Sequence, residues 1–269
     1  MEQMPVIALV GSPLVPVGEI TALGETGCAF DLTPIPWTDA PDAYAAVFVF
    51  AETPDGVIAE TVKGYVGHPH LRVICGNTAE AQLCGLRQEL RAALGQEECE
   101  RKFLVTYPDL AALEQSPFAA SSRITQTYLL SEDGATERVR ARETGGRTVY
   151  THTVKRRIDR LTSEEYEDEI DGAAYRRLLL RADPSRKAVE KVRWCILHGI
   201  HYFELDVYPF WKDRAVVELE LSEQGTAPID FPPFFRLIRE VTDDVRYKNV
   251  RLAREIPMDP VTEIGEENE

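Results

Sequence analysis

The sequence contains little cysteine, and none of it is arranged in a metal-binding or disulfide pattern. Five cysteines are spread over 269 residues without a C-x-x-C pair, which argues against a disulfide framework and a structural zinc site. The N-terminus also lacks a basic region followed by an apolar core, so we expect no secretory leader and a cytoplasmic protein. The cysteines are expected to be reduced, mostly buried thiols.

Positive charge is scarce as well. The chain has 30 Lys and Arg against 45 Asp and Glu, a formal net charge of −15, which disfavours a nucleic-acid partner. With 44% hydrophobic and 28% charged residues, the composition is that of a globular protein rather than of a disordered or membrane protein. An enclosed basic site remains compatible with this acidic surface, and the oligomeric state is open, a homodimer included.

The first 95 residues contain short apolar runs that end in turn or loop signals, as buried parallel strands do. A helical connection is expected over Gly56–Gly67, and a helix over Ala79–Leu94, where leucines recur at helical spacing. The loop Gly11–Gly18 has no Lys-Ser/Thr pair and holds two prolines, which excludes a phosphate-binding loop. We therefore predict a small α/β, Rossmann-like domain over residues 1–95, of unknown role. Its expected strands are Val6–Gly11, Ala46–Phe50 and Leu71–Gly76.

Beyond Gln96, charged and apolar residues alternate strictly between turn signals, which predicts antiparallel strands. In extended chain, Glu98, Glu100 and Lys102 share one face, and Arg138–Arg142 places three guanidinium groups on one face. A single row of this kind is also typical of the solvated face of a sheet. Here the basic residues gather on some strands and the paired carboxylates on others. This separation favours charged faces that point inward around a shared ligand. Further rows are Thr151–Lys155, Lys191–Trp194, Glu204–Val207 and Glu218–Leu221.

The two kinds of row suit two partners. Arg and Lys pair with phosphate oxygens, and Arg can do so with two parallel hydrogen bonds. Paired carboxylates beside a phosphate require a hard cation, and Mg²⁺ or Mn²⁺ takes oxygen ligands. The combination predicts metal-triphosphate chemistry.

Glu98-x-Glu100-x-Lys102, followed by Phe103-Leu104-Val105, resembles the opening signature of the CYTH, or triphosphate tunnel metalloenzyme, superfamily. Later segments resemble the family's strands in the same order, and the match covers residues 98–253. These segments are Gln126–Leu129, Arg138–Arg140, Thr153–Lys155, Glu165–Ile170, Lys191–Trp194, Glu204–Val207, Glu218–Glu220 and Glu240–Asn249.

The resemblance implies an α+β protein. Residues 96–256 would form a closed antiparallel β-barrel tunnel of about eight strands, preceded by the small α/β domain and followed by an acidic tail, residues 257–269, expected to be disordered. One segment departs from the family pattern. Ser163 stands where an Arg is common, and Thr162–Glu165 also fits a helix capping box, so a strand and a helix start are both open there.

The resemblance also assigns roles to residues. Glu98, Glu100 and Lys102 are the expected catalytic residues. The expected triphosphate ligands are Lys102, Arg138, Arg140, Lys155, Lys191 and Arg193, with Arg142 as a weaker candidate. The expected metal ligands are Glu98, Glu100, Asp206, Glu218, Glu220, Glu165 and Glu167.

The resulting prediction is metal-dependent hydrolysis of a short triphosphate, inorganic triphosphate first, with Mg²⁺ or Mn²⁺ as cofactor. One alternative is a class IV-type adenylate cyclase that makes cyclic AMP from ATP. Another is a module that binds polyphosphate or nucleotide without turnover. Fold alone does not choose among them.

Overall fold

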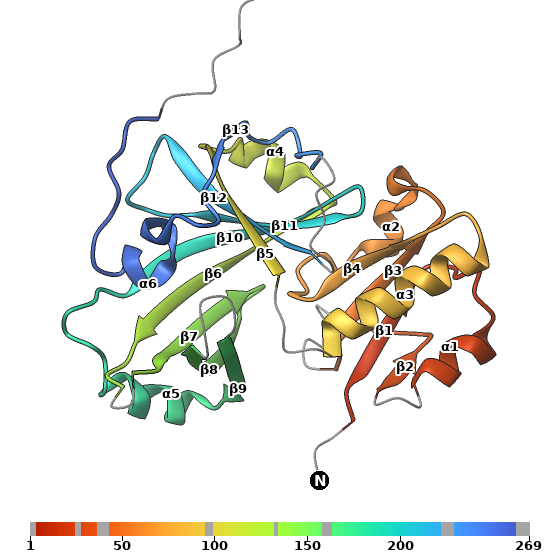
Figure 1. Ribbon diagram of the computed structural model, residues 1–269, viewed down its shortest axis with the longest axis horizontal. Coiled ribbons are helices and arrows are strands. Elements are labelled where there is room, and N and C mark those ends of the chain that lie inside the picture. Colours follow the sequence, from red (N-terminus) through yellow and green to blue (C-terminus); the bar gives the residue numbers. More distant parts are fainter. Residues whose placement is uncertain are drawn as a thin grey trace, which may run out of the picture.

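The computed structural model describes residues 4–24, 28–36, 43–94, 99–131, 134–157, 163–221 and 229–261. They form a small parallel sheet of four strands and a larger antiparallel sheet of nine strands (Figure 1). The small sheet and its helices, here called the N-terminal unit, lie beside one end of the large sheet. Among the described residues, no helix is long and apolar enough to cross a membrane.

The N-terminal unit has strand order β2-β1-β3-β4, all parallel. Every residue of β3 is buried, because helices and the large sheet cover this sheet on both faces. The predicted strands and the long helix are confirmed. The elements are β1 (Val6–Val10), α1 (Val17–Gly24), β2 (Ala29–Asp31), β3 (Ala46–Ala51), η1 (Pro54–Gly56), α2 (Ala59–Val62), β4 (Leu71–Cys75) and α3 (Ala79–Leu94).

The helix or helix-like connection expected over Gly56–Gly67 is confirmed only in part. Only one turn forms, α2, because Gly64 has φ +83° and the chain after it runs through a buried turn to β4. Helix α1 and the short strand β2 were not predicted. Both pack against the first strands through apolar residues, such as Ile20, rather than through a clear sequence period.

The large sheet has the order β13-β5-β12-β11-β10-β6-β7-β8-β9 and is antiparallel throughout. Its strands are β5 (Cys99–Thr106), β6 (Ala119–Tyr128), β7 (Thr136–Thr144), β8 (Arg147–Arg157), β9 (Ser163–Ile170), β10 (Val189–His198), β11 (His201–Val207), β12 (Arg214–Leu221) and β13 (Leu237–Glu240). The accompanying helices are α4 (Leu110–Gln115), α5 (Gly172–Leu179), η2 (Val245–Tyr247) and α6 (Asn249–Leu252).

The expectation of a closed barrel is not met by the described residues. β9 and β13 lie at the two ends of the sheet, and within the described part of the chain no strand pairing joins them. β13 has four residues, and its register with β5 shifts between Leu237 and Arg239, which ends the pairing early. What the structure establishes is a curved antiparallel sheet in an α+β protein.

The segment Ser163–Ile170 is a strand, so the helix-start interpretation of Thr162–Glu165 is wrong. Its residues pair with β8 from Arg157↔Ser163 to Tyr150↔Ile170. The helix begins only at Gly172, where the Asp171 side chain accepts a 2.7 Å hydrogen bond from the backbone N of Ala174, the usual arrangement of a helix N-cap.

The two faces of the large sheet differ sharply. One face of β5, β10, β11 and β12 is apolar and packs with α4 through residues such as Trp194, Phe203 and Leu113. Because side chains alternate along a strand, the neighbouring positions on the same strands face the other way, and there most charged residues of the predicted site lie. This second face is called the charged face below.

Candidate functional site

Four neighbouring strands bring acidic and basic side chains of the charged face into direct opposition. Directly opposed residues have their side chains on the same side of a sheet, close enough to interact. The register therefore explains why residues far apart in sequence meet here. The opposed pairs are Arg193↔Asp206, Glu204↔Glu218, Glu218↔Lys102 and Glu220↔Glu100.

Arg193 is the centre of this acidic cluster. Its Nε and Nη2 each lie 2.7 Å from an oxygen of Asp206, Nη2 also lies 2.7 Å from Oε2 of Glu218, and Nη1 donates to Glu204. Burial lowers the pKa of Arg193, but these carboxylates outweigh it and raise that pKa well above its ordinary value. Arg193 is thus a permanent cation whose hydrogen bonds hold three carboxylates together.

Lys191 shares Asp206 with Arg193. Its Nζ donates to Oδ2 of Asp206, which is fully buried. Burial and the neighbouring Arg193 lower the pKa of Lys191 to about 8, although Asp206 opposes the change. Asp206 therefore pairs with two cations at once.

Lys102 lies between two glutamates. Its Nζ is 2.7 Å from Oε1 of Glu218 and 3.1 Å from Oε1 of Glu100. Burial lowers the pKa of Lys102, but the two carboxylates raise it more. Burial among these side chains and repulsion from Glu218 raise the pKa of Glu100 to about 7, although its side chain keeps 40% of its surface accessible. Glu100 is therefore a partly exposed carboxylate whose charged form is disfavoured by its neighbours.

A second, basic cluster lies on β7, β8 and β9. Glu167 is 3.8 Å from Nη2 of Arg138 and 3.7 Å from Nη1 of Arg140, and it accepts a 2.6 Å hydrogen bond from Thr153. Burial raises the pKa of Glu167, but Arg140, Thr153 and Arg138 lower it more. Burial and then the adjacent Arg138 lower the pKa of Arg140. Both guanidinium groups thus contact Glu167.

Two buried polar atoms of this basic cluster lack a partner. Within the described residues, Nε of Arg140 and Oγ1 of Thr151 make no hydrogen bond. A buried donor without a partner costs about 1 to 3 kcal/mol, and two such groups beside paired arginines suit an anion with several oxygens. The basic cluster therefore has the donors of a phosphate site.

The acidic and basic clusters lie on the same face of the sheet, because Gln126 of β6 is opposite Val189 of β10 and Arg140 of β7. The charges of Arg193 and Glu204 influence the pKa of Arg140, and those of Arg138, Arg140 and Lys102 influence the pKa of Tyr128. Gln126 lies between the clusters, donating a 2.7 Å hydrogen bond to the Tyr128 hydroxyl, while its Oε1 is buried without a partner among the described residues.

Gln126 and Glu204 were not among the predicted site residues. Gln126 begins a segment that matches the family, and Glu204 shares the charged face with Asp206 by simple alternation. Both could have been included on those grounds. Arg142, the weaker triphosphate candidate, donates instead to Oγ of Ser122 (3.1 Å) and to the carbonyl of Gly67 (3.1 Å).

For three of the predicted site residues, the structure does not describe the side chain. Glu98 lies outside the described residues. Glu220 and Glu165 are placed by backbone only, opposite Glu100 and Lys155 respectively. Lys155 itself lies on β8 opposite Thr136.

The donor set fits a hard divalent cation in composition. Glu100 lies opposite Glu220, and Glu218 opposite Glu204; such pairs of like charge destabilise a sheet unless a cation bridges them. Among the described residues, however, no three His, Cys, Asp or Glu side chains form a group that could hold a metal ion. In that part of the chain, Glu218 and Asp206 are turned toward Lys102, Lys191 and Arg193.

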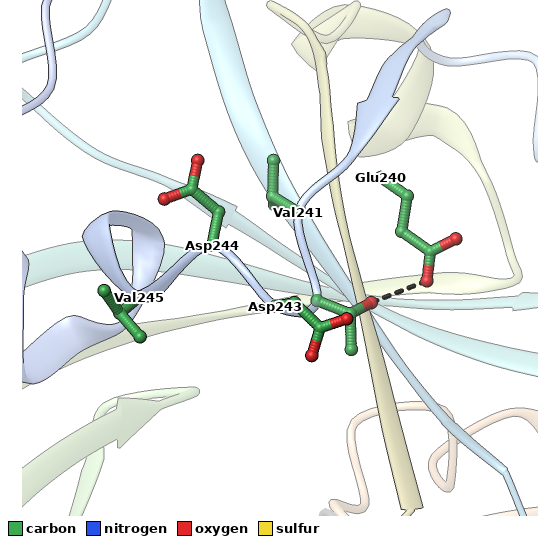
Figure 2. A pocket seen from close by; sticks show the side chains of 6 residues that line it. Glu240, Val241, Asp243, Asp244 and Val245 are labelled. Atoms are coloured by element: carbon green, nitrogen blue, oxygen red, sulfur yellow. Dashed lines mark hydrogen bonds between the residues drawn. The ribbon is translucent and has the colours of Figure 1, made fainter.

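A hollow of about 630 Å³ lies elsewhere, on the segment Glu240–Val245 between β13 and η2 (Figure 2). It exposes acidic side chains, and two of these already hold cations: Glu240 binds Arg101 (2.7 Å), and Asp244 binds Arg246 (2.7 Å). A hollow lined by carboxylates repels a polyanion, so it is not the candidate site.

Fold and site together define a protein whose antiparallel sheet carries separate acidic and basic clusters on one face. The sequence matches no protein-family model. It is 38% identical over 164 residues to an inorganic triphosphatase of Nitrosomonas europaea, an alignment that spans 60% of this chain and 99% of that protein. The chain therefore belongs to the CYTH, or triphosphate tunnel metalloenzyme, family.

Two crystal structures of a protein named NE1496 are also similar. One, described as a hypothetical protein, is 37% identical, with 60% of this chain and 100% of that chain covered and a TM-score of 0.41. The other, described as an inorganic triphosphatase, is 34% identical, with 60% and 97% covered and a TM-score of 0.40.

Proposed function

We propose that this protein hydrolyses inorganic triphosphate in a reaction that requires Mg²⁺ or Mn²⁺. The observation that carries the proposal is the separation, on one face of the sheet, of Arg138 and Arg140 from Glu100 and Glu218, with Lys102 between the glutamates. The Nitrosomonas europaea relative, an inorganic triphosphatase at 38% identity, supports the same substrate. Residues 96–256 are proposed as the catalytic unit.

The basic cluster would bind the phosphate chain. Arg138 and Arg140, with Thr151 and Lys155 nearby on β8, would hold the phosphate oxygens, and Nε of Arg140 would gain a partner. Lys102 would turn from Glu218 to a phosphoryl oxygen. We also propose that the sheet encloses the bound ligand as a tunnel, because both clusters lie on the same face of the sheet.

The acidic cluster would hold the cation, through Glu98, Glu100, Glu218 and Glu220. A bound divalent cation supplies neutralisation of phosphate charge and a lowered pKa of water. Lys191 and Arg193 would keep Asp206 and Glu218 in place, so their contribution to phosphate binding is largely indirect. Glu165 and Glu167, on the strand beside the basic cluster, would orient the attacking water. The protein's own contribution is positioning and electrostatic stabilisation.

The test is product analysis with purified protein, given inorganic triphosphate, ATP or thiamine triphosphate with Mg²⁺ or Mn²⁺. Phosphate release fastest from inorganic triphosphate is expected. Cyclic AMP with pyrophosphate would make the protein a cyclase, and binding without product would make it a sensor. The double variant Glu98→Ala/Glu100→Ala should stay folded and lose metal-dependent turnover; full activity in that variant would refute the site.

A further inference from the structure

The charged face is bounded along its strands by apolar packing at both ends. On β10, alternate residues share this face, and the order is Val189, Lys191, Arg193, Cys195, Leu197. Val189 belongs to one apolar cluster, while Cys195 and Leu197 belong to another. The charged residues occupy only the two positions between.

β11 repeats the order. Tyr202 belongs to the same cluster as Leu197, Glu204 and Asp206 follow, and Tyr208 belongs to the cluster of Val189. Cys195 lies six positions after Val189, which places their Cα atoms about 20 Å apart at about 3.3 Å per residue. The charged stretch is therefore short and bounded on more than one strand.

The end at Leu197 and Tyr202 is covered by the N-terminal unit, which Figure 1 shows beside the turn that joins β10 and β11. The covering segment is Tyr65–His70, between α2 and β4, of which residues 65–68 are buried. The Tyr202 hydroxyl lies 2.6 Å from the carbonyl oxygens of both Val66 and His68. Arg142 of β7 donates to the carbonyl of Gly67 at 3.1 Å.

This segment contacts more than one strand at that end. Its hydrogen bonds involve β11 and β7, and the charge of His70 is among the influences that lower the pKa of Glu167 on β9. The opposite end is covered from the C-terminal side, where Tyr208 donates a 2.7 Å hydrogen bond to Asn249, and Trp211 a 3.1 Å hydrogen bond to the carbonyl of Pro257.

We propose that the N-terminal unit is an end wall of the ligand site, and that Tyr65–His70 restricts the site to short phosphate chains with free ends. This inference rests on the proposed function, because it takes the charged face as the triphosphate site. A fourth phosphate at this end would meet the apolar side chain of Leu197 and a guanidinium, that of Arg142, which already donates to the Gly67 carbonyl and to Sγ of Cys195. A charged group buried against apolar side chains is costly. A nucleoside at this end would have to displace the wall.

The test uses the full chain and measures binding without turnover. Leu197→Ala removes packing against the wall. Ile196→Ala is its matched control, because Ile196 is the neighbouring residue, equally buried, with its side chain on the opposite face. Affinities for tripolyphosphate, tetrapolyphosphate and ATP are measured by titration calorimetry in EDTA. The milder Tyr202→Phe, which removes only the hydroxyl that bonds the wall, tests the same point if Leu197→Ala fails to fold.

In the wild type, tripolyphosphate is expected to bind more tightly than the two larger ligands. In Leu197→Ala, the affinity for the larger ligands relative to tripolyphosphate should rise by about tenfold, the size of effect that lost pocket contacts give, and in Ile196→Ala it should not. An unchanged ratio in both wall variants, with tripolyphosphate still bound, overturns the wall and leaves the proposed function standing. A changed ratio without phosphate release under Mg²⁺ supports the wall and overturns the hydrolase.

Discussion

Arg140 has unmet hydrogen-bonding capacity in the folded chain that a bound ligand could fill. It is desolvated, lies next to Arg138, and has a buried Nε without a partner among the described residues. We expect Arg140→Gln to lower kcat/KM for inorganic triphosphate by roughly tenfold to a hundredfold, the value of one charged hydrogen bond. The free energy of unfolding should change by less than about 1 kcal/mol, because relief of repulsion offsets the lost pairing with Glu167.

Steady-state kinetics and urea unfolding measure the two quantities. The control is Arg123→Gln, which removes an exposed arginine of β6 that points away from the charged face. Equal losses of activity in both variants would show that overall charge, rather than the position of Arg140, controls binding.

Asp206 was predicted from sequence to bind metal, yet it is fully buried and bonded to Lys191 and Arg193. Removal of one partner from a buried ion pair typically costs about 3 to 5 kcal/mol, because the remaining charge stays buried. We therefore expect Asp206→Asn to lower the free energy of unfolding by about that amount and to leave the apparent affinity for Mg²⁺ unchanged. Urea unfolding and a Mg²⁺ titration of activity separate these effects; weaker Mg²⁺ binding with unchanged stability would restore the metal role.

At the scale of strands and loops, alternation alone predicted which face of each strand carries charge. Alternation could not predict how those charges pair. Arg193 on β10, for example, contacts Glu218 on β12 across the intervening strand β11, 25 positions further along the sequence. Register between distant strands decides such contacts. The same limit applies to Tyr202 and Arg142, whose partners are carbonyl groups of the N-terminal unit.

The segment Tyr65–His70 contains a histidine that must stay neutral. Nδ1 of His68 accepts a 3.1 Å hydrogen bond from the backbone N of His70, so Nε2 carries the proton and donates to the Tyr44 carbonyl at 3.1 Å. Burial lowers the pKa of His68 to about 3, the Tyr44 carbonyl opposes this, and the charges of His70, Arg142 and Arg72 lower it further. His68 is 2% exposed, so water solvates a protonated ring there only weakly.

A histidine with a lowered folded-state pKa binds fewer protons than in the unfolded chain. Stability is therefore complete above pH 6.5 and is lost as the pH falls from 6.5 toward 3. By pH 5 the loss from His68 should reach about 2 kcal/mol. Urea unfolding between pH 7.5 and 5 should show this slope in the wild type and a shallower slope in His68→Gln. Parallel slopes would mean that other groups cause the acid sensitivity.

At the scale of the whole molecule, the two sheets share one apolar cluster. Val47 and Leu71 of the small sheet belong to it together with Leu197 and Tyr202 of the large sheet. Residues that pack into a common cluster tend to open together, so a ligand that stabilises the charged face should also stabilise the N-terminal unit, although the basic and acidic clusters contain none of that unit's strands.

Hydrogen exchange tests this coupling directly. A ligand at one hundred times its Kd adds about 2.7 kcal/mol to the state that binds it, and tripolyphosphate should slow exchange in β3 and β4 as well as in β10 and β11. Leu197→Ala, which weakens the shared cluster, should confine the slowing to the large sheet, whereas Ile196→Ala should retain it in both. If tripolyphosphate slowed exchange only in the large sheet of the wild type, the N-terminal unit would be an independently opening neighbour, and its tight packing against Tyr202 would not amount to cooperative coupling.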